Sequence, residues 1–271
     1  MLNLHSLQRL LFALLLATAV FSAQAASNFE PQIGQEGKDV IWVPTPQALI
    51  DKMLDAARVT KDDYVIDLGS GDGRTVITAA KRGANALGIE YNPDMVELSK
   101  TNAEKEGVSA RANFAKADIF ESDFSKATVI TMYLLPQLNL KLRPKILDLK
   151  PGTRIVSHAF TMDDWRADET ISSQDNASYS RTAYLWIVPA KVEGTWKTAQ
   201  GEITFKQAYQ MLGGTVKNGA STAAIETGRL RGDQITFTAG GVEYTGRVSG
   251  GTIEGSLRGG GSWSAMRAGG K

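Results

Sequence analysis

The chain has 271 residues, a formal net charge of +1 and no cysteine. This length is enough for one or two domains with substantial hydrophobic cores. A charge balance this close to neutral gives no electrostatic reason to expect nucleic acid or an anionic membrane as a partner. Without cysteine, disulfides, thiolate metal sites and cysteine nucleophiles are excluded, and we expect no metal site.

Residues 1–25 have the pattern of a secretory signal peptide. Arg9 precedes a 12-residue apolar stretch, Leu10 to Phe21, and the small-x-small sequence of Ala23 to Ala25 follows. Because this stretch is shorter than the roughly 20 residues that span a bilayer, we expect cleavage after Ala25 and export to the periplasm. An uncleaved membrane anchor is the alternative. After cleavage, no stable membrane span is expected in the mature chain.

The first predicted helix follows an apolar stretch that ends at the turn Pro44-Thr45-Pro46. Thr45 is a suitable N-cap, and Pro46 suits the first helical position. Apolar residues then recur at helical spacing, so this helix is expected to cover one face of a sheet. They are Leu49, Ile50, Met53, Leu54 and Ala57.

The stretch from Asp62 to Arg74 combines a strand, a glycine-rich turn and the start of a helix. Tyr64 to Ile66 is a short run of strand-forming residues, and it ends at the carboxylate of Asp67. Glycines then occupy every second position, at Gly69, Gly71 and Gly73. Strand, glycine turn and helix in this order open a nucleotide-binding α/β domain.

The glycine spacing differs from that of dinucleotide-binding loops, which follow G-x-G-x-x-G so that a pyrophosphate can lie against bare backbone. Counting from Gly69, the third glycine would fall at Arg74, and Asp72 adds a negative charge inside the loop. We therefore predict a ligand without phosphates, and the preceding Asp67 predicts one with positive charge. S-adenosylmethionine fits, because it carries an ammonium and a sulfonium and no phosphate.

Further strands and helices alternate after the glycine turn. A second strand ends at Glu90, 17 residues after Gly73, where an acid is suited to bind the two hydroxyls of a ribose. A helix follows to about Glu106, and a later helix over 138–149 is expected to break at Pro144. Strands are predicted at 112–116, 128–133, 153–158 and 183–188, the last one antiparallel. Residues 26–189 therefore predict an α/β domain with a doubly wound, mostly parallel sheet.

Residues 190–271 predict a different structure. About two-thirds of the 27 glycines lie beyond Pro189, and short strand-like runs recur about every ten residues. We predict a small antiparallel β meander or half-barrel without catalytic chemistry. Trp196, Tyr244 and Trp263 are expected in its core, and a ligand groove lined by them is the alternative. The runs are at 192–197, 202–206, 234–238, 242–248, 252–257 and 262–267.

Polar residues converge at one edge of the predicted sheet, where ligands of doubly wound sheets bind. They are Asp67, Glu90, Asp118, Tyr133 and His158. His158 is the one histidine of the mature chain, and it is either a structural imidazole or a catalytic base.

The pattern Asp67-x-Gly69-x-Gly71-x-Gly73, followed by Glu90, resembles the first motif of class I S-adenosylmethionine-dependent methyltransferases. The resemblance implies that this acid and these glycines, with Ser70 and Glu90, bind the cofactor. It also implies that Asp118 meets the adenine amino group and that Ile119 packs on the ring.

Trp42, the turn at 44–46 and Tyr133-Leu134-Leu135-Pro136 add a narrower resemblance over residues 38–165. With DLGSGDGR they resemble small protein-lysine methyltransferases related to the mitochondrial enzyme that modifies the c-ring protein of ATP synthase. This implies methylation of an amine, a protein lysine, in a channel lined by Tyr133 and Pro136. The chain lacks the Asn/Asp-Pro-Pro-Tyr motif of methyltransferases that act on DNA bases and glutamine. The alternatives are methylation of a small exported molecule at oxygen or nitrogen, and a non-catalytic module that binds through residues 190–271.

Overall fold

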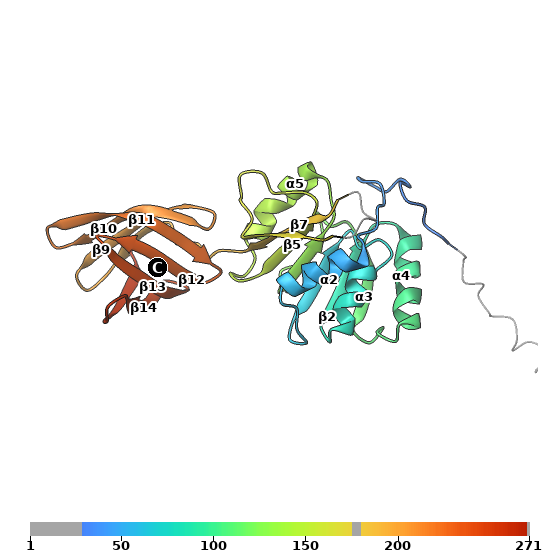
Figure 1. Ribbon diagram of the computed structural model, residues 1–271, viewed down its shortest axis with the longest axis horizontal. Helices are drawn as coiled ribbons and strands as arrows, with labels where there is room; N and C mark the ends of the chain where they lie inside the picture. The colour runs from blue at the N-terminus through green and yellow to red at the C-terminus, as the bar shows by residue number, and fades with distance from the viewer. Residues whose placement is uncertain (1–28, 175–179, 270–271) are drawn as a thin grey trace, which may run out of the picture. The chain divides into compact units, whose positions relative to one another are not determined.

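The computed structural model describes residues 29–174 and 180–269. These residues form an α/β domain followed by a closed β barrel (Figure 1). The signal peptide expected at residues 1–25 lies outside the described residues. Within the described ranges, no helix is both long and apolar enough to cross a membrane.

The helices of the α/β domain are α2 (Gln47–Ala56), α3 (Arg74–Lys81), α4 (Pro93–Lys105) and α5 (Pro136–Leu147). Its strands are β1 (Tyr64–Leu68), β2 (Asn85–Glu90), β3 (Ala112–Lys116), β4 (Val129–Met132), β5 (Arg154–His158), β6 (Glu169–Ser172) and β7 (Thr182–Ile187).

The sheet has the strand order β3-β2-β1-β4-β5-β7-β6. Strands β1 to β5 pair in parallel, and β7 pairs antiparallel with both β5 and β6. The predicted doubly wound sheet is therefore confirmed. Because the strand order reverses between β1 and β4, a crevice is expected beyond the carboxyl ends of these two strands.

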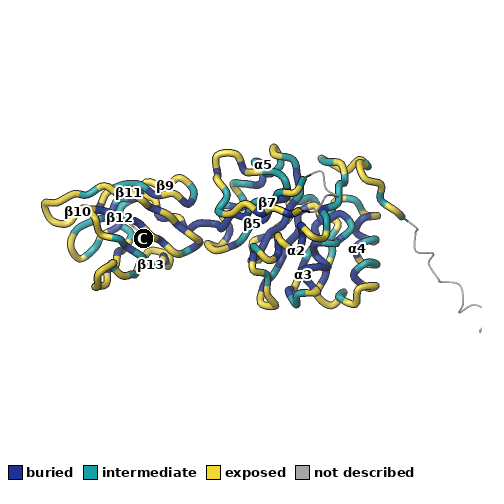
Figure 2. The backbone as a smooth tube through the Cα atoms, in the orientation of Figure 1, coloured by how far each residue is buried: buried dark blue, intermediate teal, exposed yellow. Residues whose placement is uncertain are grey.

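Both faces of the sheet are covered, which explains why its strands read as continuous apolar runs. Neighbouring residues belong to different cores: Val65 and Val129 pack with α2 and α3, whereas Ile66 and Ile130 pack with α5. This alternation is the two-residue period of a pleated strand. In Figure 2 the central strands are correspondingly dark with buried residues.

Two helices differ from the sequence-based expectation. Helix α2 has Pro46 as its N-cap residue, with no side-chain cap, because the hydroxyl of Thr45 bonds His158 instead. Helix α5 runs through Pro144 without a break. A proline inside a helix removes one backbone hydrogen bond, and here Leu142 and Ile146 on either side of it are buried against the sheet.

The barrel contains β8 (Gly194–Lys197), β9 (Gly201–Ala208), β10 (Met211–Asn218), β11 (Ser221–Arg231), β12 (Gln234–Ala239), β13 (Val242–Ser249), β14 (Thr252–Leu257) and β15 (Ser262–Arg267). The antiparallel β structure was predicted, but the strands close completely, with β9 pairing with both β8 and β10. Trp196, Tyr244 and Trp263 are buried in its core, as expected.

Side chains of the barrel bond the α/β domain at several points. The ring of Tyr209 stacks on Trp165 with centroids 5.8 Å apart, and its hydroxyl donates to the carboxylate of Asp164 at 2.9 Å. Arg229 pairs with Asp168, whose side chain is only 1% exposed, at 2.6 Å. The domain boundary expected at 189/190 stays a prediction, and it falls on buried residues rather than on an exposed linker.

Candidate active site

The glycine loop between β1 and α3 needs glycine at each alternate position. Gly69, Gly71 and Gly73 have φ angles of 79°, 55° and 83°, in the left-handed region that disfavours other residues. A Cβ on Gly71 would also lie 2.6 Å from Nε1 of Trp42, and one on Gly73 would lie 2.8 Å from the ring of Phe114. The loop is therefore closely covered by side chains from other parts of the chain.

The backbone amides of this loop are largely used inside the protein. The amides of Gly69 and Ser70 donate to the carbonyl of Ile89, and the amide of Gly71 donates to Glu90 at 2.9 Å. Asp72 accepts a two-pronged ion pair from Arg74, with a shortest distance of 2.6 Å. Because these donors are already engaged, the loop is not arranged as a phosphate cradle. Arg74 also offsets the charge of Asp72 that we expected to repel phosphate.

Asp67 is the last residue but one of β1 and Glu90 is the last residue of the neighbouring β2, and both line the cavity. Asp67 is buried and accepts a hydrogen bond from Thr131 at 2.6 Å. Burial raises the pKa of Asp67 to about 7, and the charges of Glu90 and Asp72 act in the same direction. Glu90 accepts from the amides of Gly71 and Asn92, both at 2.9 Å, which fixes its carboxylate at the cavity wall.

Asp118 and Ile119, after β3, line the same cavity. One oxygen of Asp118 accepts from the amide of Phe120 at 2.8 Å, and the other pairs with Lys38 at 2.9 Å. The hydrogen bond from Lys38 is the main cause that holds the pKa of Asp118 below its usual value. In this arrangement the carboxylate expected to meet an adenine amino group is already bonded to an ammonium.

Lys38 belongs to a strap, residues 34–45, that lies along the cavity. The strap is a small hairpin: the amide of Gly34 donates to the carbonyl of Trp42, and the amide of Trp42 donates to that of Gln35, both at 2.9 Å. Its tip carries Lys38, and its second arm brings Trp42 over Gly71. The strap thus forms one wall of the site.

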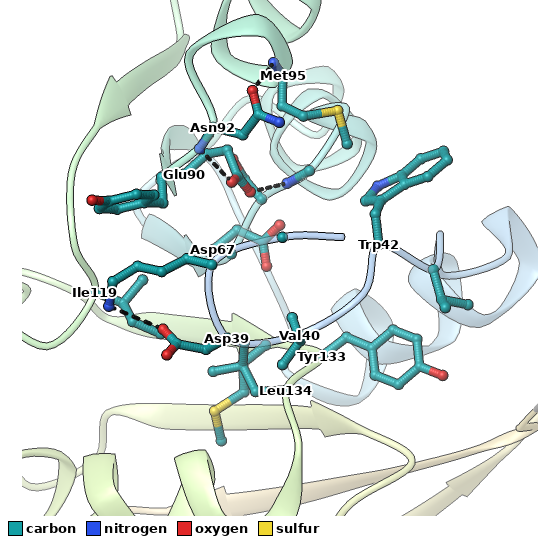
Figure 3. Close-up of a pocket in the computed structure, with 18 of the residues that line it drawn as sticks. Asp39, Val40, Trp42, Asp67, Glu90, Asn92, Met95, Ile119, Tyr133 and Leu134 are labelled. Carbon is teal, nitrogen blue, oxygen red and sulfur yellow. Dashed lines mark hydrogen bonds and ion pairs between the residues drawn. The ribbon is translucent and has the colours of Figure 1, made fainter. Parts of the chain in front are cut away.

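Tyr133, directly after β4, forms a more apolar end of the cavity with Leu134 and Phe160. The rings of Tyr133 and Phe160 are 6.2 Å apart and stacked. Burial raises the pKa of the Tyr133 hydroxyl, so the phenol is protonated at neutral pH. Figure 3 shows Trp42 and Tyr133 on one side of the view and Ile119 on the other, with Asp67 between them.

The cavity volume is about 680 Å³, within the usual range for a small-molecule site. The carboxylates at the strand ends, the apolar Ile119 and the aromatic end can therefore contact one ligand of moderate size.

A family model described as the ANTKMT methyltransferase domain matches residues 67–169. A protein-lysine N-methyltransferase of Saccharolobus islandicus strain REY15A is 45% identical over 152 residues, which are 55% of this chain and 94% of that protein. The chain belongs to the S-adenosylmethionine-dependent methyltransferases. The methyltransferase is thus an enzyme, and its cofactor is S-adenosylmethionine.

Two further similarities support the fold and the cofactor of this methyltransferase. The human lysine N-methyltransferase named for the c-ring protein of ATP synthase is 34% identical over 128 residues, 47% of this chain and 54% of the human protein. A solved structure of an RNA methyltransferase from Salinibacter ruber, in complex with S-adenosyl-L-homocysteine, is 45% identical with a TM-score of 0.52. It covers 55% of this chain and 96% of its own. The predicted class I fold is confirmed.

The residues of the methyltransferase cavity fit this cofactor. The hydroxyl oxygen of Ser70 is buried in the wall and has no hydrogen-bond partner among the described residues. This oxygen is packed against Gly88, where an added Cβ would lie 2.5 Å from it, so the fit to the cofactor rests on the other groups of the wall. The buried carboxyl of Asp67 suits a cationic ligand, and the engaged loop amides suit one without phosphates.

The structure gathers all of the expected cofactor residues except Gly73 at the cavity wall, and Gly73 lies within the loop that forms it. Of the expected catalytic residues, only Tyr133 lines the cavity. Pro136 is exposed at the first position of α5, and His158 is fully buried behind Tyr133. Sequence reasoning missed Lys38 and Phe160. The one available signal was closeness in sequence to recognised residues: Lys38 lies four residues before Trp42, and Phe160 lies two residues after His158.

Proposed function

We propose that this methyltransferase transfers a methyl group to the side-chain amine of a protein lysine, and that it acts after export to the periplasm. The observation that carries the acceptor proposal is the charge of the cavity lining, which contains six acids and two bases. The acids are Glu36, Asp39, Asp67, Asp72, Glu90 and Asp118, and the bases are Lys38 and Arg74. The two bases pair with Asp72 and with Asp118 and Asp39, and the lining still carries a net negative charge, which disfavours a phosphate-rich acceptor.

The names of the relatives support the same acceptor. The archaeal and human relatives are both named as lysine N-methyltransferases. An RNA acceptor is the competing proposal, because the Salinibacter structure, also 45% identical, is titled an RNA methyltransferase. The acidic cavity and the net charge of +1 favour the lysine.

When bound, S-adenosylmethionine supplies a methyl group on a positively charged sulfur that an amine nitrogen can displace. Asp67, Ser70, Glu90 and the glycine loop would hold it, with Ile119 against the adenine. The chain must also bring the amine into line with the methyl group, at about 3 Å, because alignment supplies much of the rate enhancement. Tyr133 is placed to do so.

The amine must lose a proton before it can attack, since the pKa of a lysine in water is about 10.4. The apolar end of the cavity, with Tyr133, Leu134 and Phe160, disfavours the charged ammonium and lowers that pKa by desolvation. The Tyr133 phenol is protonated and both nitrogens of His158 are hydrogen-bonded, so neither is placed to act as a base. Deprotonation through desolvation requires no dedicated base.

The test combines a labelled cofactor with two Tyr133 variants. We expect the protein to label a discrete band at lysine in an extract of exported and membrane proteins. Tyr133→Ala should lower kcat about tenfold or more while S-adenosyl-L-homocysteine affinity stays within about twofold, because positioning is lost but cofactor contacts are kept. Tyr133→Phe is the matched control, and it should retain most of the activity because the ring remains.

Other outcomes of the labelling would replace the proposal. Label confined to small molecules would indicate methylation of a small exported compound, and label in RNA would indicate the nucleic-acid acceptor. Cofactor binding with no label in any fraction would contradict the lysine proposal.

Export is tested separately, because the acceptor proposal does not depend on it. N-terminal sequencing of the protein from a periplasmic fraction should give Ala26 as the first residue, since Ala23 to Ala25 is a small-x-small site. An intact Met1 in the membrane fraction would mean an anchor instead.

A further inference from the structure

His158, the last residue of β5, touches both ends of the site without lining the cavity. Its side chain is 0% exposed. Its ring centroid lies 3.8 Å from that of Tyr133, which forms the acceptor wall. Its Nδ1 lies 3.0 Å from Oγ1 of Thr45, which belongs to the strap. Two parts of the site that are far apart in sequence therefore meet on one imidazole.

The partners of His158 define which nitrogen carries the proton. Nε2 lies 3.2 Å from the backbone carbonyl of Ser180, which can only accept a hydrogen bond. Nε2 is therefore the donor, and Nδ1 accepts from the hydroxyl of Thr45. Burial lowers the pKa of His158, which favours this neutral form. Both ring nitrogens are therefore hydrogen-bonded to neighbouring residues.

Thr45 continues the connection to the cofactor loop. Its carbonyl accepts from Nη1 of Arg74 at 3.2 Å. Arg74 in turn holds Asp72 through Nε at 3.0 Å and Nη2 at 2.6 Å. Asp72 and Arg74 flank Gly73, so the chain of contacts runs from Tyr133 through His158, Thr45 and Arg74 into the glycine loop.

We infer that His158 is a positioning residue that couples the Tyr133 wall to the cofactor loop through Thr45 and Arg74. Its contact with Tyr133 fixes the ring against which the acceptor lies, and this part rests on the proposed function. Its bond to Thr45 fixes the strap and Arg74 beside the loop, and this part rests on cofactor binding alone. The imidazole thereby fixes the acceptor wall and the cofactor loop relative to each other.

Calorimetry with S-adenosyl-L-homocysteine tests the cofactor half. His158→Phe keeps an aromatic ring beside Tyr133 but removes both hydrogen bonds, and Thr45→Val removes only the hydroxyl. Each should weaken binding roughly 3- to 10-fold, the range expected for one hydrogen bond. The double variant should bind S-adenosyl-L-homocysteine no more weakly than the single variant with the lower affinity, because both changes break the same contact. Thr45→Ser should restore the affinity.

Thr153→Val is the matched control. The Thr153 hydroxyl is also buried and donates to the carbonyl of Lys150 at 2.8 Å, but it lies at the opposite end of β5. Its loss should lower the melting temperature and leave cofactor affinity unchanged. A purely structural role for His158 predicts the same result for Thr45→Val, which would overturn the inference. Multiplying effects in the double variant would also overturn it.

Kinetics test the acceptor half once an acceptor is labelled. Thr45→Val should lower kcat more than it raises KM for the acceptor, and the shape of the pH–rate profile should not change. Loss of a limb of that profile in His158→Phe would make the imidazole a base and contradict a positioning role. Cofactor affinity is measured without an acceptor, so the calorimetric test of His158 remains valid even if lysine is not the acceptor. The lysine proposal and the positioning role of His158 can therefore fail independently.

Discussion

Asp67 is a carboxyl group whose protonation decides what it can bind. Its burial raises the pKa from the usual 3.8 to about 7, so about half of these groups are protonated at neutral pH. A cation bound beside it favours the ionised form, and binding of S-adenosylmethionine should therefore release a proton. The same shift affects stability: the folded state binds this proton more tightly, so its stabilising contribution falls as pH rises from about 4 to 7.

Cofactor affinity should depend on pH through Asp67. From pH 5 to pH 7 we expect affinity to rise by at most about tenfold per pH unit and then to level off. Calorimetry in buffers of different ionisation enthalpy measures the proton release directly. Asp67→Asn should bind more weakly and lose most of this pH dependence. An unchanged pH dependence in Asp67→Asn would show that another group titrates.

Glu90 should contribute to binding both as a ligand and as a support of the loop. Glu90→Ala leaves the amides of Gly71 and Asn92 without their acceptor, and we expect cofactor affinity to weaken by about 1–3 kcal/mol. NAD should not bind the wild-type protein, because the loop amides are already engaged. Calorimetry with both ligands checks this, with Glu97→Ala on the exposed face of α4 as the control. Tight NAD binding would contradict the account of the loop.

At the scale of elements, the strap and the glycine loop fit against each other at Gly71. Gly71→Ala should weaken cofactor binding and lower the melting temperature, because the new Cβ displaces the Trp42 indole and the φ of 55° disfavours alanine. Gly251→Ala is the control, since nothing lies within 4 Å of the added methyl there. Equal effects of the two substitutions in calorimetry and thermal unfolding would refute this packing.

The sequence predicted the α/β elements well because their signals are local and periodic. It predicted the carboxylates at the strand ends because parallel strands place their carboxyl ends at one edge. It missed β6, which has only four residues. It also missed β10 and β11, whose alternation is interrupted by irregularities at Leu212/Thr215 and Ile225/Thr227. The contacts of Lys38 with Asp118 and of Thr45 with His158 join residues far apart in sequence, and no periodic pattern encodes them.

At the scale of the whole molecule, the sheet of the α/β domain is complete without the barrel, and no barrel residue lines the described cavity. The barrel instead protects residues of the α/β domain, because Tyr209 covers Trp165 and Arg229 neutralises Asp168. The cofactor site and the stability of the domain should therefore respond differently to loss of the barrel.

A protein that ends at Ala190 should fold and bind S-adenosyl-L-homocysteine within about twofold of the full-length chain. Its melting temperature should fall by several degrees, because each kcal/mol lost shifts the transition by about 2–8 °C in domains of this size. Titration and scanning calorimetry measure the two effects. The absence of a cooperative transition would mean that the barrel completes the core of the first domain.

Closure of the barrel also decides how it can recognise another molecule. Every strand from β8 to β15 has a hydrogen-bonded neighbour on each side, so the barrel has no full-length edge strand to pair with an extended peptide. The shortest seam joins β15 to β8 at Met266 and Arg267 only. Recognition by β-augmentation, which needs an unpaired edge, is therefore confined to the rest of β15, and elsewhere the barrel can bind only through side chains on its outer surface or through its hairpin loops.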